Sequence, residues 1–518
     1  MSNFHSWTIQ SNENSTRRSG HISYLPLAHP TKLFNEGGIG YDEKQIDDTD
    51  LPSCARCGVS ICQVRNLLVV FGGTGSNSAE EINDKVYYKI RTEKGNNWTE
   101  MRVNNDPFST FKNNQTVLIS RKLPLKPKKR YGATFSPNKS NTSIYLFGGT
   151  DVRGYFRDIW KLHLEPSQED FLEMEQKFSE LGIKNFLENF PSIYPFWEHI
   201  EATKMKLEEL LKEENFQNLT STIPAITDGG KTLLCKPISM SRIRPRYKHA
   251  ACLFDNKLFI IGGGQDAETN VDEDGRAVLD RSGRPFTTLI DSFDDVLEFV
   301  TYFDLKTQKW FILQTLPCKH RASLEFNYKS GFPEKRLAFA WNFSRKNNIL
   351  YLVGGLQTKK TRVSSMATKR RPFNDAWSLN FEKTENGQTA LTWKFMDYLP
   401  SFTQKTGIST KFGTYFQGFL NKVHSKTELN SDNFMTWGIS FASLALDDEE
   451  SRIYVSGGTK NYLVDRSSWF YLDYEVPERV GSVFERRVGV DSLKNICLRI
   501  IDSQNGIGSS SNFEMKTS

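Results

Sequence analysis

The sequence predicts an all-β protein built from repeated antiparallel units, and three observations carry this prediction. A run of aliphatic and aromatic residues that ends in Gly-Gly recurs along the chain. Aromatic residues, which favour strands, are frequent, with 37 Phe, 18 Tyr and 10 Trp among 518 residues. Similar residues flank each Gly-Gly pair in a similar order, which is typical of a repeat architecture.

Five copies of the Gly-Gly phrase are strong and a sixth is weak. The strong copies end at Gly72-Gly73, Gly148-Gly149, Gly262-Gly263, Gly354-Gly355 and Gly457-Gly458, and the weak copy ends at Gly37-Gly38. Two glycines after a run of strand formers indicate a buried strand whose end needs a positive φ or a close backbone approach. The copies lie 35 to 114 residues apart, so most units contain insertions and the first unit is short.

Each unit has the elements of four strands. An arginine precedes the first strand, and a polar turn joins that strand to the Gly-Gly strand, which predicts a hairpin. A third strand opens with Asp and an apolar residue, as in Asp158-Ile159-Trp160. A tryptophan marks the fourth strand in several units; the candidates are Trp98, Trp310, Trp393 and, late in its unit, Trp197.

This order of strands, glycines and tryptophan resembles the kelch repeat. The resemblance implies a β-propeller of about six four-stranded blades around a central channel, which we assign to residues 17–476. A kelch repeat has about 50 residues, so the long gaps hold insertions. Residues 166–216 have helical periodicity and predict an α-helical insertion outside the ring, whereas residues 265–289 and 357–373 are expected to be loops.

The overall composition favours a protein without a membrane segment. There is no signal peptide and no apolar run long enough to span a bilayer. The seven cysteines lack disulfide spacing, so we expect a cytoplasmic location, with a nuclear one also open. The net charge of +6 is too small to indicate nucleic-acid binding by itself. Residues 1–16 and 503–518 are expected to be disordered.

We find no pattern typical of an enzyme, and we expect neither a metal nor a cofactor. Cys54 and Cys57 lack the two further ligands of a structural zinc site. The acidic run from Asn270 has Arg281 where a calcium loop requires glutamate. Kelch propellers that are copper-radical oxidases need Tyr, Cys and His ligands that cannot be assembled from this chain.

The arginines that precede the first strands form the candidate binding site. In a kelch blade this position lies beside the channel mouth, so the predicted substrate-binding residues are Arg18, Arg130, Tyr131, Arg246, Tyr247, His249 and Arg336. Guanidinium groups that converge there could hold a carboxylate, such as a protein C-terminus. The alternative is that each arginine pairs with a carboxylate of its own blade and braces the propeller.

Several phrases also resemble the kelch domain-containing protein 10 family, one group of substrate receptors for cullin ubiquitin ligases. They are residues 66–75, 144–150, 246–249, 260–264 and 331–336. The resemblance implies that the chain is the substrate-recognition subunit of a cullin–RING ligase and binds Elongin B/C. The other interpretation is a kelch scaffold or regulator that acts by direct protein binding.

Receptors of this kind bind Elongin C through a helix after the last blade, called a BC-box. The tail at residues 477–502 is a degenerate candidate, because Val480, Phe484 and Val488 would share one face of a helix. A short helix that caps the edge of the propeller is the alternative for the same residues.

Overall fold

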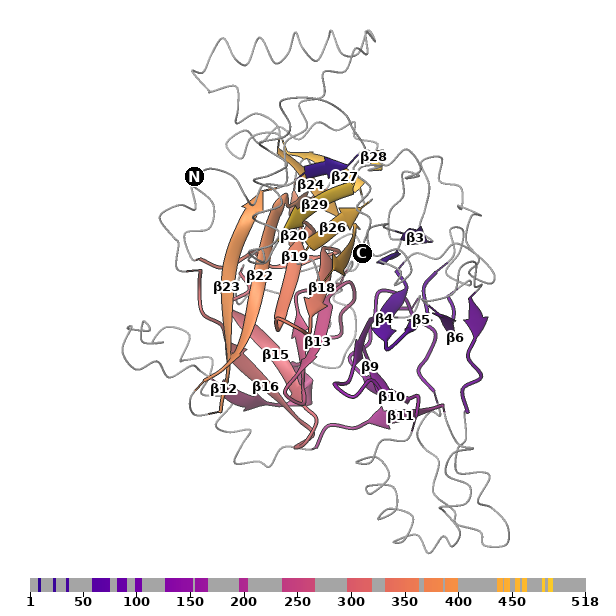
Figure 1. Ribbon diagram of the computed structural model, residues 1–518. Coiled ribbons are helices and arrows are strands. Elements are labelled where there is room, and N and C mark those ends of the chain that lie inside the picture. The colour runs from indigo at the N-terminus through magenta and orange to yellow at the C-terminus, as the bar shows by residue number, and fades with distance from the viewer. Residues whose placement is uncertain are drawn as a thin grey trace, which may run out of the picture.

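The computed structural model describes the following residues: 8–10, 22–24, 34–36, 58–74, 82–90, 98–104, 126–151, 154–165, 195–203, 235–265, 296–318, 331–362, 368–384, 387–398, 436–440, 442–447, 452–456, 459–463, 478–479 and 483–487. Their regular structure is almost entirely β, with one short 3-10 helix, η4 (Met240–Arg242). The sheets follow one another around a common centre, which is a β-propeller arrangement (Figure 1). No helix within these ranges is long and apolar enough to cross a membrane.

Four sheets have four antiparallel strands each, and a fifth sheet has five. The first sheet contains β4 (Ser60–Val64), β5 (Leu67–Phe71), β6 (Val86–Ile90) and β7 (Thr99–Glu100). The second contains β8 (Thr134–Pro137), β9 (Ser143–Phe147), β10 (Ile159–His163) and β11 (Phe196–Ile200). The third contains β13 (Ala250–Phe254), β14 (Lys257–Ile261), β15 (Phe299–Asp304) and β16 (Lys309–Gln314), with β12 (Cys235–Ile238) outside β16. The fourth contains β18 (Ala340–Ser344), β19 (Ile349–Val353), β22 (Asp375–Lys383) and β23 (Thr389–Tyr398).

The last sheet joins the two ends of the chain. Its strand order is β1 (Thr8–Gln10), β29 (Val483–Arg487), β26 (Arg452–Ser456) and β25 (Ser443–Asp447). Part of the segment expected to be disordered at residues 1–16 is therefore a strand. An N-terminal strand that completes the last sheet pairs an edge that would otherwise be open.

The first strands of successive sheets are neighbours: β4 contacts β8, β8 contacts β13, β13 contacts β18, and β18 contacts β25. Strand β25 also contacts β2 (Ile22–Tyr24), which pairs with β3 (Phe34–Glu36) as a two-stranded sheet. The prediction of six four-stranded blades is not met. Within the described residues four sheets have four strands, the third has five, and the N-terminal unit consists of two.

The Gly-Gly pairs lie where the second strand of each sheet ends. Strands β5, β9, β14 and β19 each end one residue before such a pair. Gly262, for example, has a φ of +64°, and an added Cβ would lie 2.8 Å from the carbonyl oxygen of Arg336 in the next sheet. Both reasons expected for the glycines, a positive φ and a close backbone approach, are therefore confirmed here.

The hydrophobic core lies between the faces of adjacent sheets. The tryptophans expected on the fourth strands are all buried: Trp98, Trp197, Trp310 and Trp393. The last three pack against residues of the preceding sheet, whereas Trp98 packs against residues of its own sheet. Trp393 also donates its indole N–H to the carbonyl oxygen of Leu297, just before β15 of the third sheet, at 2.9 Å. The fourth strands of the second, third and fourth sheets thus help to hold the sheets in order.

Two of the predicted insertions need correction. The segment 166–216 was expected to be helical, but it contains β11, whose Trp197 packs inside the second sheet. Its remaining expected helices lie outside the described residues, as does almost all of the expected loop at 265–289. The expected loop at 357–373 contains β20 (Leu356–Arg362) and β21 (Thr368–Pro372), which form a hairpin.

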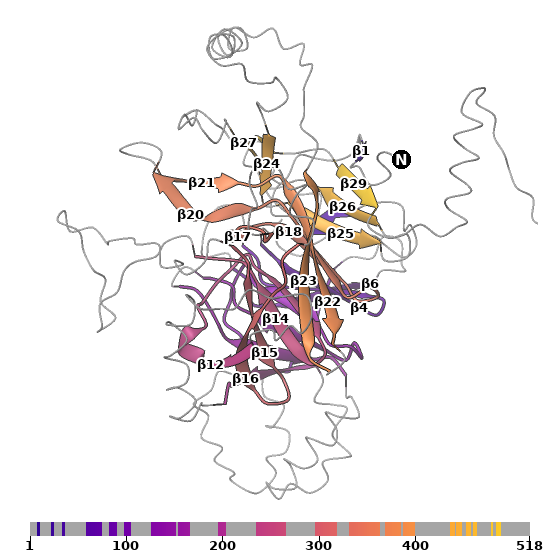
Figure 2. The ribbon, with the colours of Figure 1, turned by 90° about the vertical axis from the view of Figure 1, so that its left-hand side faces the viewer.

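Six further strands form two small three-stranded sheets. Strand β17 (Arg336–Leu337) pairs with β20, and β27 (Thr459–Leu463) pairs with β24 (Thr436–Ser440) and β28 (Glu478–Arg479). Strand β21 contacts both β24 and β27, so the two small sheets lie side by side (Figure 2).

The tail is not the helix that its apolar spacing predicted. Residues 483–487 form β29, in which Phe484 is the register partner of Val455 on one side and Ile9 on the other. Val480 and Val488 lie outside the described residues. The spacing of four residues was misleading, because β26 has β25 on one edge only and the tail supplies the strand that pairs with its other edge.

Candidate functional site

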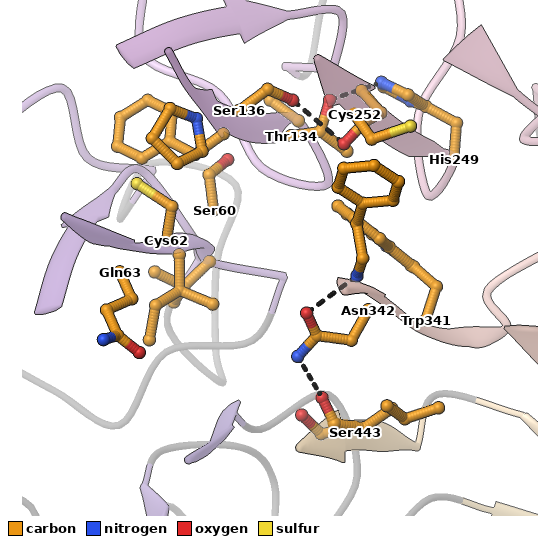
Figure 3. A pocket seen from close by; sticks show the side chains of 18 of the residues that line it. Ser60, Cys62, Gln63, Thr134, Ser136, His249, Cys252, Trp341, Asn342 and Ser443 are labelled. Atoms are coloured by element: carbon orange, nitrogen blue, oxygen red, sulfur yellow. Dashed lines mark hydrogen bonds between the residues drawn. The ribbon is translucent and has the colours of Figure 1, made fainter. Parts of the chain in front are cut away.

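A cavity of about 490 Å³ lies at the common centre of the sheets. Residues from the first strand of all five sheets line it, that is from β4, β8, β13, β18 and β25 (Figure 3). This is the central channel of the propeller. All five of the large sheets contribute to it.

Four residues that precede the first strands of four successive sheets are linked by three backbone hydrogen bonds around one end of the channel. The amide of Gly132 donates to the carbonyl of Gly58 at 2.7 Å, Lys248 donates to Gly132 at 2.8 Å, and Ala338 donates to Lys248 at 3.1 Å. All four residues have a positive φ, between 51° and 68°. We call Gly58, Gly132, Lys248 and Ala338 the amide ring, and the end of the channel that they border the mouth.

A second set of backbone bonds joins adjacent sheets just outside the amide ring. In each, the second glycine of a Gly-Gly pair donates to the carbonyl of the arginine that opens the next sheet. The bonds are Gly73 to Arg130 at 3.0 Å, Gly149 to Arg246 at 2.8 Å and Gly263 to Arg336 at 2.9 Å. The mouth is therefore held by repeated backbone bonds between sheets rather than by flexible side chains.

The side chain of Arg130 is buried inside its own sheet. Its guanidinium group forms two hydrogen bonds with the Asp158 carboxylate, at 2.6 and 2.9 Å, and a third with the carbonyl of Gly148 at 2.9 Å. Burial alone would raise the pKa of Asp158, but the bonds and charge of Arg130, with a bond from Trp160, hold that pKa below its usual value. Arg130 is thus a brace between two strands of one sheet.

Arg336 repeats this arrangement in the fourth sheet. Its guanidinium group binds both oxygens of Asp375 and donates to the carbonyl of Gly354 at 3.0 Å. Both side chains of the ion pair have no exposed surface. Trp377 donates its indole N–H to Asp375 at 2.8 Å, as Trp160 does to Asp158 at 2.7 Å.

The predicted convergence of arginines on one carboxylate pocket is therefore wrong for Arg130 and Arg336, and the bracing alternative describes them. Arg246 is partly buried and donates to the carbonyl of Gly262 at 3.1 Å, the same contact that the other two make. Arg18 lies outside the described residues. The backbone carbonyls of Arg130, Arg246 and Arg336 accept the bonds between sheets beside the mouth, whereas their side chains form hydrogen bonds away from it.

The aromatic residues predicted for the site do gather beside the mouth. The rings of Tyr131 and Tyr247 meet edge to face at 6.1 Å, and Tyr155 lies 5.4 Å from Tyr247. The ammonium group of Lys248 lies 4.6 Å from the centre of the Tyr247 ring. Tyr247 is fully buried, whereas Tyr131 and the amide-ring residue Lys248 are partly exposed.

His249 lines the channel wall, but as a neutral, buried group. Its Nε2 atom lies 2.9 Å from the hydroxyl of Thr134 in the second sheet. Burial, followed by the charge of Arg246, lowers the pKa of His249 to about 3. His249 therefore connects two sheets and carries no charge near neutral pH.

Polar groups of the channel wall also connect neighbouring sheets. Ser136 donates to the carbonyl of Ala251 at 2.9 Å, and Asn342 donates to the carbonyl of Leu444 at 3.1 Å (Figure 3). The sequence did not single out these residues or Lys248. Their common signal is position after the opening arginine: Ser136 and Asn342 lie on first strands, and Lys248 lies between Arg246 and the start of β13.

The thiols of the channel are not activated. Burial raises the pKa of Cys62, an effect that the charge of Arg345 partly offsets, and burial also raises the pKa of Cys252. Cys62 lies on β4, the first strand of its sheet. No Asp or Glu is among the described residues that line the channel. The lining also includes Arg65, Lys248 and Arg345, so it can bind a polypeptide by hydrogen bonds, by apolar contacts and by attraction of these cations for carboxylates.

A second cavity, of about 650 Å³, lies between the second and third sheets. Its lining includes Trp160, His199, Phe303 and Trp310. Among the described residues, the indole nitrogen of Trp310 and the Nδ1 atom of His199 have no hydrogen-bond partner. Only one pair of sheets contributes to this crevice, so we take the central channel as the main candidate site.

Comparisons with known proteins add little to this geometry. No protein-family model matches the chain, and no curated protein matches it. A solved structure titled "Structure of YjhT" is similar over 87% of this chain and 93% of that chain, with 10% sequence identity and a TM-score of 0.36.

Proposed function

We propose that this chain is a kelch-type propeller that binds other proteins at the mouth of its channel and acts as a scaffold. The observation that carries the proposal is the amide ring, a hydrogen-bonded rim that includes the partly exposed Lys248 and has the partly exposed Tyr131 beside it. A preformed rim favours binding, because little order has to be imposed when the partner arrives. The channel lining has the cations Arg65, Lys248 and Arg345 and no carboxylate among its described residues, which supports binding of a partner over acid–base catalysis.

The repeated brace supports the kelch type. In the second and fourth sheets, the arginine, the Gly-Gly pair, the aspartate and its tryptophan occupy equivalent places. The fourth-strand tryptophans complete the order of residues on which the resemblance to kelch repeats was based.

The role of ubiquitin-ligase receptor is implied only by the resemblance, and the tail favours the scaffold over it. An Elongin C-binding helix was expected to present Val480, Phe484 and Val488. Residues 483–487 instead form an inner strand of the last sheet, so Phe484 belongs to the propeller. A receptor would need a docking element elsewhere in the chain.

Affinity capture with the intact chain tests the proposal. The variant Lys248→Glu reverses one charge at the mouth, and Lys139→Glu makes the same change on the exposed turn at the other end of β8. We expect captured proteins to be depleted by the first variant and retained by the second. Equal capture by both variants would contradict binding at the mouth. Direct binding to purified Elongin B/C would restore the receptor over the scaffold.

A further inference from the structure

The hairpin of β20 and β21 concentrates the positive charge of the chain. Each strand has three basic residues: Lys359, Lys360 and Arg362 in β20, and Lys369, Arg370 and Arg371 in β21. Neither strand has an acidic residue. These six charges equal the formal net charge of the whole protein, +6, so the rest of the chain is balanced. We call residues 356–372 the basic hairpin.

The register of the hairpin places like charges opposite each other. Lys360 is the direct cross-strand partner of Arg370, while Lys369 and Arg362 face Thr361 and Thr368. Like charges in directly opposed positions destabilise a strand pair. In the adjoining strands β24, β27 and β28, the one acidic residue is Glu478, and its register partner is Lys460. The described strands therefore offer the hairpin no acidic cross-strand partner.

The basic hairpin begins at the mouth of the channel. Leu356 pairs with Leu337, and Leu337 directly precedes Ala338 of the amide ring. Lys248, the one charged residue of the amide ring, is bonded to Ala338 through the backbone. Figure 2 shows β20 and β21 next to β17, on the same side of the propeller as β24 and β27. A partner at the mouth would therefore meet the basic hairpin.

We propose that the basic hairpin docks an acidic segment of the protein that binds at the mouth. This inference rests on the proposed function and adds the chemistry of the partner. Alternate residues of an extended peptide repeat at the same interval as alternate residues of a strand, so carboxylates could match the hairpin along its length. Opposite charge would also speed the encounter of the two surfaces.

The observations favour an acidic peptide over a nucleic acid. A polynucleotide is typically held by a positive track that follows its backbone over many phosphates. Here the two strands of the hairpin, of seven and five residues, account for the net positive charge, and the remainder of the chain is neutral in sum. A short acidic segment matches a patch of that extent.

Fluorescence anisotropy with two labelled probes of equal length, an oligoglutamate peptide and an oligothymidylate, tests the inference on the full chain. The variant Lys360→Gln/Arg370→Gln removes the opposed charges and keeps polar side chains. Its matched control, Lys139→Gln/Lys306→Gln, removes two exposed lysines elsewhere. We expect the hairpin variant to weaken oligoglutamate binding about tenfold. We expect the control to match the wild-type protein, and added salt to weaken binding by the wild type.

Two results would overturn the inference: equal oligoglutamate affinities for both variants, or tighter hairpin-dependent binding of oligothymidylate, which would make the hairpin a nucleic-acid surface. The test is separate from that of the proposed function, because Lys248 is unchanged in it. If the protein captures partners through the mouth but does not bind oligoglutamate, the inference fails and the proposed function stands. If oligoglutamate binds through the hairpin but Lys248→Glu leaves the captured proteins unchanged, the proposed function fails and the acid-binding hairpin stands.

Discussion

Arg336 and Asp375 form an ion pair with no exposed surface. Arg336 is the first residue of β17, in the small sheet with β20 and β21, and Asp375 is the first residue of β22, in the fourth sheet. The backbone carbonyl of the same arginine accepts a hydrogen bond from Gly263 of the preceding sheet. Arg336 therefore joins the small sheet to the fourth sheet through its side chain, and to the third sheet through its backbone carbonyl.

Breaking that pair should destabilise the protein strongly. Asp375→Asn leaves the guanidinium charge of Arg336 buried without a counter-charge, and we expect a loss of about 3–5 kcal/mol in the free energy of unfolding. The control is Lys383→Gln, which removes the exposed pair of Lys383 with Asp255 and should cost about 0–1 kcal/mol. Chemical denaturation measures both. Similar losses for the two variants would refute the bracing role.

The glycines at the ends of the second strands should resist substitution for two separable reasons. Gly262→Ala places a residue at a φ of +64° and brings its Cβ within 2.8 Å of the Arg336 carbonyl. Gly387→Ala meets a similar φ of +71° but has nothing within 4 Å of its Cβ. Backbone strain alone should cost about 1–2 kcal/mol at Gly387, and we expect a larger loss at Gly262. Equal thermal stabilities for the two variants would mean that the close approach to Arg336 does not matter.

Stability should fall as the pH drops below about 6.5 because of His249. Its pKa of about 3 in the folded protein lies below the unfolded value near 6.5, so the unfolded state binds more protons between these limits. Stability therefore rises with pH across this window, by up to about 3 kcal/mol between pH 4 and pH 6.5. His249→Gln, which cannot be protonated there, should flatten the dependence. Thermal unfolding measured from pH 4 to pH 7 checks this, and an unchanged slope in the variant would show that other groups cause it.

Cysteines placed at Ile9 and Phe484 should form a disulfide within one chain. These residues are register partners in β1 and β29, so their Cβ atoms are expected to lie about 4.5–5.5 Å apart. Ile9→Cys with Arg487→Cys is out of register and serves as the control. Peptide mapping by mass spectrometry identifies the bond. Crosslinking in the control pair but not in the first would contradict the strand pairing of the two chain ends.

The strands and their glycines could be predicted because their signals are local. Runs such as residues 67–71 and 258–261 alternate or fill both faces of a strand, and the φ of the following glycine depends on its own backbone. The role of the arginines could not be decided in this way. Arg130 and Arg336 lie 28 and 39 residues from their aspartates, so the choice between pocket and brace depends on how distant strands pair.

For the tail and for residues 357–373, by contrast, the local sequence pattern gave a wrong prediction, because pairing with distant strands decided the structure. Val480, Phe484 and Val488 fit a helix by spacing, yet residues 483–487 complete the last sheet between β26 and β1. The charged segment at 357–373 was expected to be a solvated loop, but its strands pair with each other and with β17. Hydrogen-bonding partners contributed by distant parts of the chain decided both outcomes.

Site-specific photo-crosslinking tests the central claim, protein binding at the mouth, most directly. The photoreactive amino acid benzoylphenylalanine would replace Tyr131, which is partly exposed beside the amide ring, and in a separate variant Lys139 on the turn at the other end of β8. The account predicts that a cell extract yields protein adducts at position 131 that depend on Lys248 and are absent at position 139. Adducts at position 139 alone, or adducts at 131 that persist in Lys248→Glu, would contradict it.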